Sequence, residues 1–198
     1  IGFERRSKDE LLLKFAYCYQ GTSTGDNPRF ILECCELPTL PSGWEVLESV
    51  PDAQSCYSGK ESVVNWADVE CFEGSATRGD SAFGRDGVII GQMNSLPASI
   101  YMGRKFGNST PVVIPNEGVP LAVIWTFLAH KSFGQELRKV NPKRSVDNGY
   151  VGKIPFGLFH WKRVASEKYP HGLPEPYSDD PTQWLFHGHP ASCTEALQ

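Results

Sequence analysis

The pattern of hydrophobic and polar positions in the first half of the chain predicts short strands separated by polar loops. Residues 11–20, 30–37 and 62–67 are apolar or aromatic enough to form strands. Residues 40–59 are interrupted by Pro, Ser and Gly, which predicts a loop with only short pieces of regular structure. Residues 73–87 are rich in Gly, Ser and charge, so we expect an exposed loop there.

Three further strands are predicted over residues 87–93, 99–106 and 111–115. The first of them contains a continuous apolar run at residues 88–90, which is typical of a strand buried on both faces. We therefore expect these three segments to belong to one twisted, mainly antiparallel sheet.

Helical signals follow these strands. Pro120 suits the first turn of a helix, and apolar residues recur after it at helical spacing. Ser132 and Gln135 form a capping-box pattern that predicts a second helix, which Pro142 ends.

The last elements expected in the body are a strand over residues 149–156 and a short helix over residues 159–168. Strands that come first and helices that come later predict an α+β fold with a mostly antiparallel twisted sheet. We expect residues 1–168 to form one domain. Residues 169–198, rich in Pro, Gly, His and Asp, are expected to form an extended C-terminal tail packed on it.

The composition is that of a globular protein, with 40% hydrophobic and 12% aromatic residues. Trp66, Trp125 and Trp161 are expected in the core. The chain contains no apolar run of about 18 residues, so we expect no membrane span. Its first ten residues are highly charged, unlike a signal peptide, which favours a cytoplasmic location. Because the sequence begins at Ile1 and not at Met, we expect it to be a piece of a longer protein.

The charge of the chain is polarised, although its net value is only −4. Residues 21–86 hold 4 basic and 12 acidic side chains, whereas residues 101–168 hold 11 basic and 4 acidic ones. The basic third could follow a phosphate backbone, and the acidic third could not. Ordinary solvated helix faces would give the same pattern.

Six cysteines are present, and no two of them are spaced as C-x-x-C, so a zinc site is not supported. We expect buried free thiols in a reducing compartment. Cys34 and Cys35 are adjacent within a predicted strand, and their side chains are therefore expected on opposite faces.

The sequence offers little support for an independent enzyme. Cys71, His160 and Asp147 are the residue types of a Cys/His hydrolase, but no local signature links them. His187 and His189 could bind a metal ion together with His160, but no spacing fixes a further ligand. The glycine-rich motifs that bind phosphate groups are absent from the sequence.

Five segments of unusual composition carry a resemblance to a known family. The most distinctive is YPHGLPEPYSDDPTQWLFHGHP at residues 169–190. The others are GTSTGDNPRF at 21–30, SGKESVVNW at 58–66, GVIIGQMNSLPASIYMG at 87–103 and VDNGYVGKIPF at 146–156. Together they resemble the C-terminal target-recognition region of large adenine-specific DNA methyltransferases, of the type IIG restriction–modification and BREX phage-defence kinds. The resemblance covers residues 15–190.

This resemblance implies a fold like that of the target-recognition domain of type I restriction specificity subunits. The chain departs from the family pattern at Gly91, Asn94, Asp147 and Gly157, where the family has Ser, Arg, Thr and Asp. The change at Asn94 removes a guanidinium that could contact a base or a phosphate group.

Methyltransferases of this family bind S-adenosylmethionine through an F-x-G-x-G turn and hold the flipped adenine with an N-P-P-Y/F motif. Neither motif occurs in this sequence. We therefore expect no catalytic residue, no cofactor and no metal ion in this chain. The resemblance implies that the methyltransferase domain of the same parent chain binds S-adenosylmethionine and transfers the methyl group.

Basic residues in the positive third of the chain are candidates for contacts with DNA phosphates. Lys139, Lys143 and Arg144 follow the second predicted helix, and Arg104 and Lys105 lie in the same region. A solvated helix end would explain the first three equally well.

Two loops supply further candidates. Thr22, Thr24 and Asn27 could contact phosphates, or they could instead bond to their own turn. Arg78 and Arg85 are the candidates for entry into the major groove, and we expect them at the rim of a concave basic face.

Gln92 and Asn94 lie where a predicted strand ends, and their amides have the bidentate geometry that adenine requires. Ordinary polar residues at a strand end would look the same. The sequence thus predicts a domain that binds double-stranded DNA and selects a sequence. The alternative is a protein-interaction module that docks onto the methyltransferase core or a partner subunit.

Overall fold

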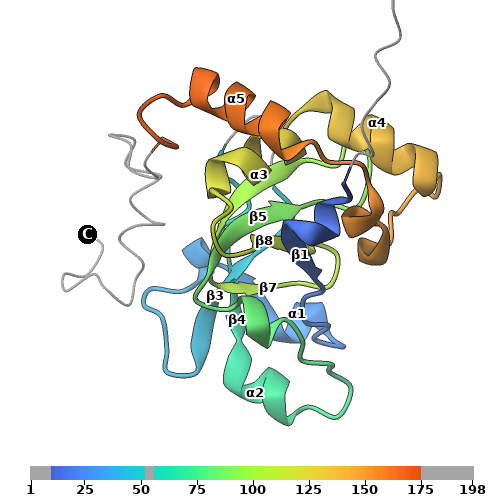
Figure 1. The fold of residues 1–198 in the computed structure, drawn as a ribbon. Coiled ribbons are helices and arrows are strands. Elements are labelled where there is room, and N and C mark those ends of the chain that lie inside the picture. Colours follow the sequence, from blue (N-terminus) through green and yellow to red (C-terminus); the bar gives the residue numbers. More distant parts are fainter. Residues whose placement is uncertain (1–9, 52–55, 175–198) are drawn as a thin grey trace, which may run out of the picture.

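The structure, a computed structural model, describes residues 10–51 and 56–174, and the strands in this part of the chain form two sheets (Figure 1). The first sheet is antiparallel throughout and has the order β1 (Ala16–Tyr19), β8 (Val112–Pro115), β5 (Asp86–Ile90) and β6 (Ala98–Met102). The second has the order β2 (Ile31–Glu33), β4 (Ser62–Asn65), β3 (Trp44–Glu48) and β7 (Lys105–Phe106), and β7 runs parallel to β3. The fold is therefore α+β with mostly antiparallel sheets, as the sequence predicts.

The longer helices lie together over one face of the first sheet (Figure 1). They are α3 (Leu121–Leu128), α4 (Lys131–Val140) and α5 (Leu158–Lys168). Two shorter helices, α1 (Asn27–Phe30) and α2 (Trp66–Cys71), lie beside the second sheet. Short 3-10 helices connect these elements: η1 (Leu12–Lys14), η2 (Cys34–Glu36), η3 (Asp80–Ala82) and η4 (Asn148–Lys153).

The apolar run in β5 organises the core on both faces of the first sheet. Val88 and Ile90 pack towards the helices, and Ile89 packs on the opposite side, against Tyr101 and Phe106. This alternation follows from the two-residue period of a strand. The side chains of Val88, Ile89 and Ile90 are all buried, so the prediction of a strand covered on both faces is confirmed. The prediction of a buried Trp66, Trp125 and Trp161 is also confirmed.

A buried ion pair joins the two sheets. The ammonium of Lys60 lies 2.5 Å from Oε2 of Glu48, which is on β3 of the second sheet, and the two side chains are 8% and 1% exposed. The same ammonium donates to the carbonyl of Ile100 at 2.9 Å, and the backbone N–H of Met102 donates to Oε1 of Glu48 at 2.9 Å. Because Ile100 and Met102 belong to β6, this network ties one sheet to the other.

Some predicted strands are wrong. The stretch 30–37 keeps only the three-residue β2, because Glu33 and Glu36 form a capping box that turns the chain into η2. The strand expected over residues 149–156 is instead η4, followed by a single bridge between Leu11 and Pro155. The stretch 40–59, expected to be a loop with short pieces of regular structure, contains the five-residue β3.

Two further expectations are corrected. The strand expected over residues 99–106 is split between β6 and β7, because the chain turns at Gly103, which has a φ of +79°, and passes to the second sheet. The helix expected from Ser132 begins at Lys131, and its N-cap is His130, whose Nδ1 accepts from the Ser132 N–H at 3.2 Å. The capping box predicted from Ser132 and Gln135 is therefore wrong.

The cysteines in the described residues are free, but they are not uniformly buried. Cys18, Cys34 and Cys56 are partly buried, whereas Cys35 and Cys71 are exposed, so the expectation of buried thiols is wrong for the last two. Burial raises the pKa of Cys18 to about 12, which keeps this thiol protonated at neutral pH. Cys34 and Cys35 lie in η2, so the expected strand geometry does not apply to them. Cys193 and most of the predicted tail lie outside the described residues.

Candidate nucleic-acid interface

Two adjoining hollows form a surface that we call the polar groove. The larger has a volume of about 420 Å³ and the smaller about 120 Å³, and both are lined by Val50 and Ser109. Apolar residues such as Val50 and Met93 form part of the lining, and just over half of the lining residues carry hydroxyl or amide side chains. They are Gln92, Asn94, Ser95 and Ser145 in the larger hollow and Thr22, Thr24, Asn27, Ser49, Ser62, Asn108 and Thr110 in the smaller, with Ser109 in both.

The loop of residues 92–95 is held in an unusual backbone conformation. Asn94 and Leu96 have φ values of 55° and 56°, in the left-handed region that glycine favours. The side chain of Leu96 is buried and anchors the loop, and the Gly91 N–H donates to the carbonyl of Pro97 at 2.7 Å. As a result Asn94 is exposed on the groove and Gln92 is half-buried beside it.

A second loop, residues 143–145, borders the same hollow. The buried amide of Asn141 accepts the N–H of Lys143 at 3.2 Å, and the N–H of Val146 donates to the carbonyl of Gln92 at 2.9 Å. Ser145 lines the hollow, while Lys143 and Arg144 are exposed next to it. The two loops therefore touch through their backbones.

Lys143 also pairs with Asp147, at 2.9 Å between Nζ and Oδ2. This hydrogen bond and the opposite charge raise the pKa of Lys143 and lower the pKa of Asp147. Both side chains are largely exposed, so a DNA phosphate could replace Asp147 as the partner of Lys143 at little cost.

The threonines predicted to contact phosphates line the smaller hollow but are buried, and their hydroxyls already have partners. Thr22 Oγ1 donates to the carbonyl of Arg78 and accepts from its N–H, both at 3.1 Å. Thr24 Oγ1 donates to Oδ1 of Asn27 at 2.5 Å. These contacts favour the turn-forming role that the sequence also allowed, and Asn27 is the exposed member of the group.

The glycine that precedes these threonines sits against another backbone segment. A Cβ on Gly21 would lie 2.3 Å from the carbonyl oxygen of Phe106 and 2.4 Å from that of Gly107. We expect Gly21→Ala to lower the free energy of unfolding by about 1–3 kcal/mol, because backbone must move to relieve the overlap. Urea denaturation checks this. The control is Gly149→Ala, where a Cβ meets no atom within 4 Å, and an equal effect in both variants would contradict the prediction.

The remaining predicted residues do not line the polar groove. Lys105 packs with its Nζ 4.0 Å from the ring centroid of Trp66 and 4.1 Å from that of Phe83, and pairs with Glu45 at 3.6 Å. This side chain is only 14% exposed, so it is poorly placed to meet DNA. Arg78, Arg85, Arg104 and Lys139 are exposed elsewhere on the surface.

The structure also contributes residues that the sequence did not single out. Asn108, Ser109 and Ser145 line the groove, and their only sequence signal is a polar turn next to an apolar segment. Arg138 was not singled out either. Its guanidinium donates to backbone carbonyls in both loops of the larger hollow, namely those of Asn94, Lys143 and Arg144.

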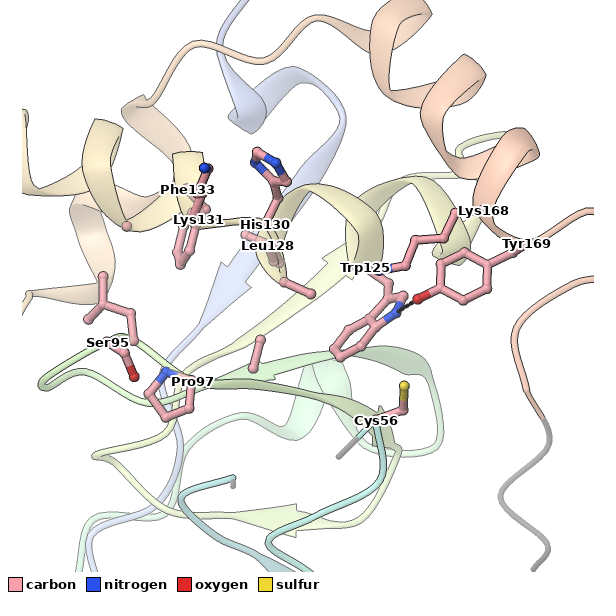
Figure 2. Close-up of a pocket in the computed structure, with 14 residues that line it drawn as sticks. Cys56, Ser95, Pro97, Trp125, Leu128, His130, Lys131, Phe133, Lys168 and Tyr169 are labelled. Atoms are coloured by element: carbon pink, nitrogen blue, oxygen red, sulfur yellow. Dashed lines mark hydrogen bonds between the residues drawn. The ribbon is translucent and has the colours of Figure 1, made fainter. Parts of the chain in front are cut away.

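A third hollow of about 400 Å³ lies on the other side of Ser95 and Pro97, against the helices (Figure 2). Its floor is apolar, and Trp125 Nε1 donates to the hydroxyl of Tyr169 at 2.8 Å across one end (Figure 2). Lys131 and Lys168 are the charged residues in its lining. Ser95 and Pro97 thus line both this hollow and the larger hollow of the polar groove.

Within residues 10–51 and 56–174, His, Cys, Asp and Glu side chains form no group of three that could hold a metal ion. The proposed metal ligands His187 and His189 lie outside this part of the chain. The same part contains no helix long and apolar enough to cross a membrane.

Comparison with protein-family models and with curated proteins gives no match. The function of the groove must therefore be inferred from the groove itself. Its amides, hydroxyls and neighbouring basic side chains can form hydrogen bonds and ion pairs. The described lining contains Glu48 as its acidic residue, and that carboxylate is bound to Lys60.

Proposed function

We propose that this chain is the sequence-specific recognition domain of a DNA adenine methyltransferase from a restriction–modification or phage-defence system. The observation that carries the proposal is the polar groove, in which Gln92 and Asn94 lie next to the basic loop of Lys143 and Arg144. In this proposal the α+β fold corresponds to the target-recognition domain of type I restriction specificity subunits.

The two loops offer the two kinds of contact that sequence-specific DNA binding requires. Side-chain amides such as those of Gln92 and Asn94 can pair with N6 and N7 of adenine in the major groove. Lys143 and Arg144 are exposed cations suited to phosphate oxygens, which fix the register of the protein on the duplex. The two loops are joined by hydrogen bonds, so one duplex could meet both.

The proposal assigns binding and selection to this chain and chemistry to another domain. The methyltransferase domain of the same parent chain would bind S-adenosylmethionine and transfer the methyl group. Double-stranded DNA and that domain are the proposed partners.

One observation favours the alternative, a protein-docking module. Phe159 on α5 is 87% exposed and Tyr17 on the edge strand β1 is 60% exposed. Large exposed apolar side chains are common in protein interfaces. Either side chain could contact the methyltransferase core while the polar groove meets DNA.

The test compares variants of the two loops for binding to a duplex that the wild-type chain selects from a random pool. Gln92→Ala is expected to weaken binding to that duplex by about 1–3 kcal/mol and binding to a scrambled duplex very little. Lys143→Ala with Arg144→Ala is expected to weaken binding to both duplexes alike. This variant should also reduce the slope of the logarithm of the binding constant against the logarithm of the salt concentration by about one to two units. Fluorescence anisotropy at several salt concentrations gives both quantities.

The matched control is Lys162→Ala with Arg163→Ala, which removes two exposed cations from α5, away from the groove. This control should leave the preference for the selected duplex unchanged. If the wild-type chain prefers no duplex, or if neither loop variant alters binding, the region is a docking module and the proposal is wrong.

A further inference from the structure

Arg138 connects the two loops that border the larger hollow. It lies in the last turn of α4, and its Nη1 donates to the carbonyls of Lys143 and Arg144, the latter at 3.1 Å. Its Nη2 donates to the carbonyl of Asn94 at 3.2 Å. One guanidinium therefore holds the backbone of the 92–95 loop and of the 143–145 loop.

These hydrogen bonds require an arginine. The guanidinium is planar and presents several N–H groups in fixed directions, so it can serve acceptors on two separate segments at once. A lysine ammonium is a single point charge and cannot keep the same three carbonyls in one fixed arrangement. The carbonyls are backbone groups, so their positions determine where the loops themselves lie.

The 92–95 loop depends on such support. Asn94 is exposed and has a left-handed backbone, which asparagine tolerates, but Leu96 shares this conformation, and a leucine keeps it only where neighbouring groups enforce it. On one side the loop is anchored by the buried Leu96, and on the other by the bond from the Val146 N–H to the Gln92 carbonyl. Arg138 supplies the contact at Asn94 itself.

We propose that Arg138 is a positioning residue that fixes the base-reading loop against the phosphate-binding loop and thereby sets the DNA sequence preference. The inference rests on the proposed function. Base readout requires donors and acceptors held within a few tenths of an ångström, whereas attraction to phosphates tolerates a looser arrangement. Loss of the clamp should therefore reduce discrimination between sequences more than it reduces overall affinity.

The experiment uses the full chain with Arg138→Lys and Arg138→Met, and Arg163→Met as the control. Arg163 is 72% exposed on α5 and pairs with Glu167 at 4.0 Å, so this control removes the same charge away from both loops. We expect Arg138→Lys to keep the salt dependence of binding, because the charge remains. The ratio of its affinities for the selected and the scrambled duplex should nevertheless fall about 10-fold. Arg138→Met should lose that preference and also flatten the salt dependence.

Amide hydrogen exchange provides a readout that does not involve DNA. In Arg138→Met, exchange should accelerate at residues 92–95 and 143–146 and remain unchanged in β5 and α3, while Arg163→Met should alter neither loop. Faster exchange throughout the chain would show a general structural role and overturn the inference.

The remaining outcomes separate the inference from the proposed function. If the wild-type chain prefers one duplex and Arg138→Lys retains that preference in full, Arg138 does not position the loop, and the proposed function still stands. If the wild-type chain prefers no duplex, the proposed function and this inference both fail.

Discussion

Lys60→Met is expected to lower the free energy of unfolding by about 3–5 kcal/mol, because it leaves the carboxylate of Glu48 buried without its partner. Glu48 is fully buried, and among the described residues the N–H of Met102 remains as its donor in this variant. In urea denaturation, the midpoint should fall, and the dependence of the free energy of unfolding on urea concentration should be unchanged. The effect is large because an unpaired buried charge costs far more than the net contribution of the pair.

Two companion variants test the cause. Lys14→Met removes a cation from an exposed ion pair with Glu10, at 58% and 50% exposure, and should cost less than about 1 kcal/mol. Glu48→Leu combined with Lys60→Met removes both charges, and should recover stability relative to Lys60→Met alone. If Lys60→Met is no more destabilising than Lys14→Met, loss of the partner of the buried Glu48 carboxylate does not destabilise this fold.

Phe127→Ala is expected to destabilise the protein by about 3–5 kcal/mol, through the lost burial of the ring and the cavity that remains. The ring centroid of Phe127 lies 5.1 Å from those of Phe156 and Trp161 and 5.9 Å from that of Phe133. Phe127 therefore joins α3 to α4, to α5 and to the segment after η4. Thermal and urea unfolding give the change in stability.

Phe159→Ala is the matched control, because it removes the same ring from a position that is 87% exposed. It should change stability by no more than about 0.5 kcal/mol. A comparable loss in both phenylalanine variants would mean that the helical layer is not held together at Phe127.

Local sequence patterns predicted those elements in which the spacing of the apolar residues matches the faces that the fold buries. β5 and α3 are examples, because the apolar run at residues 88–90 and the helical spacing after Pro120 have few alternative readings. The strand predicted at residues 30–37 was too long for β2, and β3 was expected only as one of the short pieces of residues 40–59, because the extent of both strands depends on pairing with β4. Residues 149–156 were predicted as a strand, but Val151 is buried from η4 and Ile154 from the residue after it, since a 3-10 turn can bury apolar side chains as a strand can.

The candidate site was predictable where polar residues end a buried strand, as at Gln92 and Asn94. The role of a basic side chain was not predictable where that side chain binds a backbone carbonyl or an aromatic ring from a distant segment. Arg138 and Lys105 look alike in the sequence as basic residues among others. One clamps two loops, whereas the other is enclosed by Trp66 and Phe83.

The route of the chain between the two sheets has a consequence for the order of folding. β1, the first strand, pairs with β8, and β3 pairs with β7, so each sheet is completed only by residues 105–115. Both sheets are therefore completed late in synthesis, the second at β7 and the first at β8, and contacts between distant segments make this kind of folding slow. Residues 10–104 made alone would expose the unpaired edges of β1 and β3. A division of the chain before residue 105 would therefore leave both sheets incomplete.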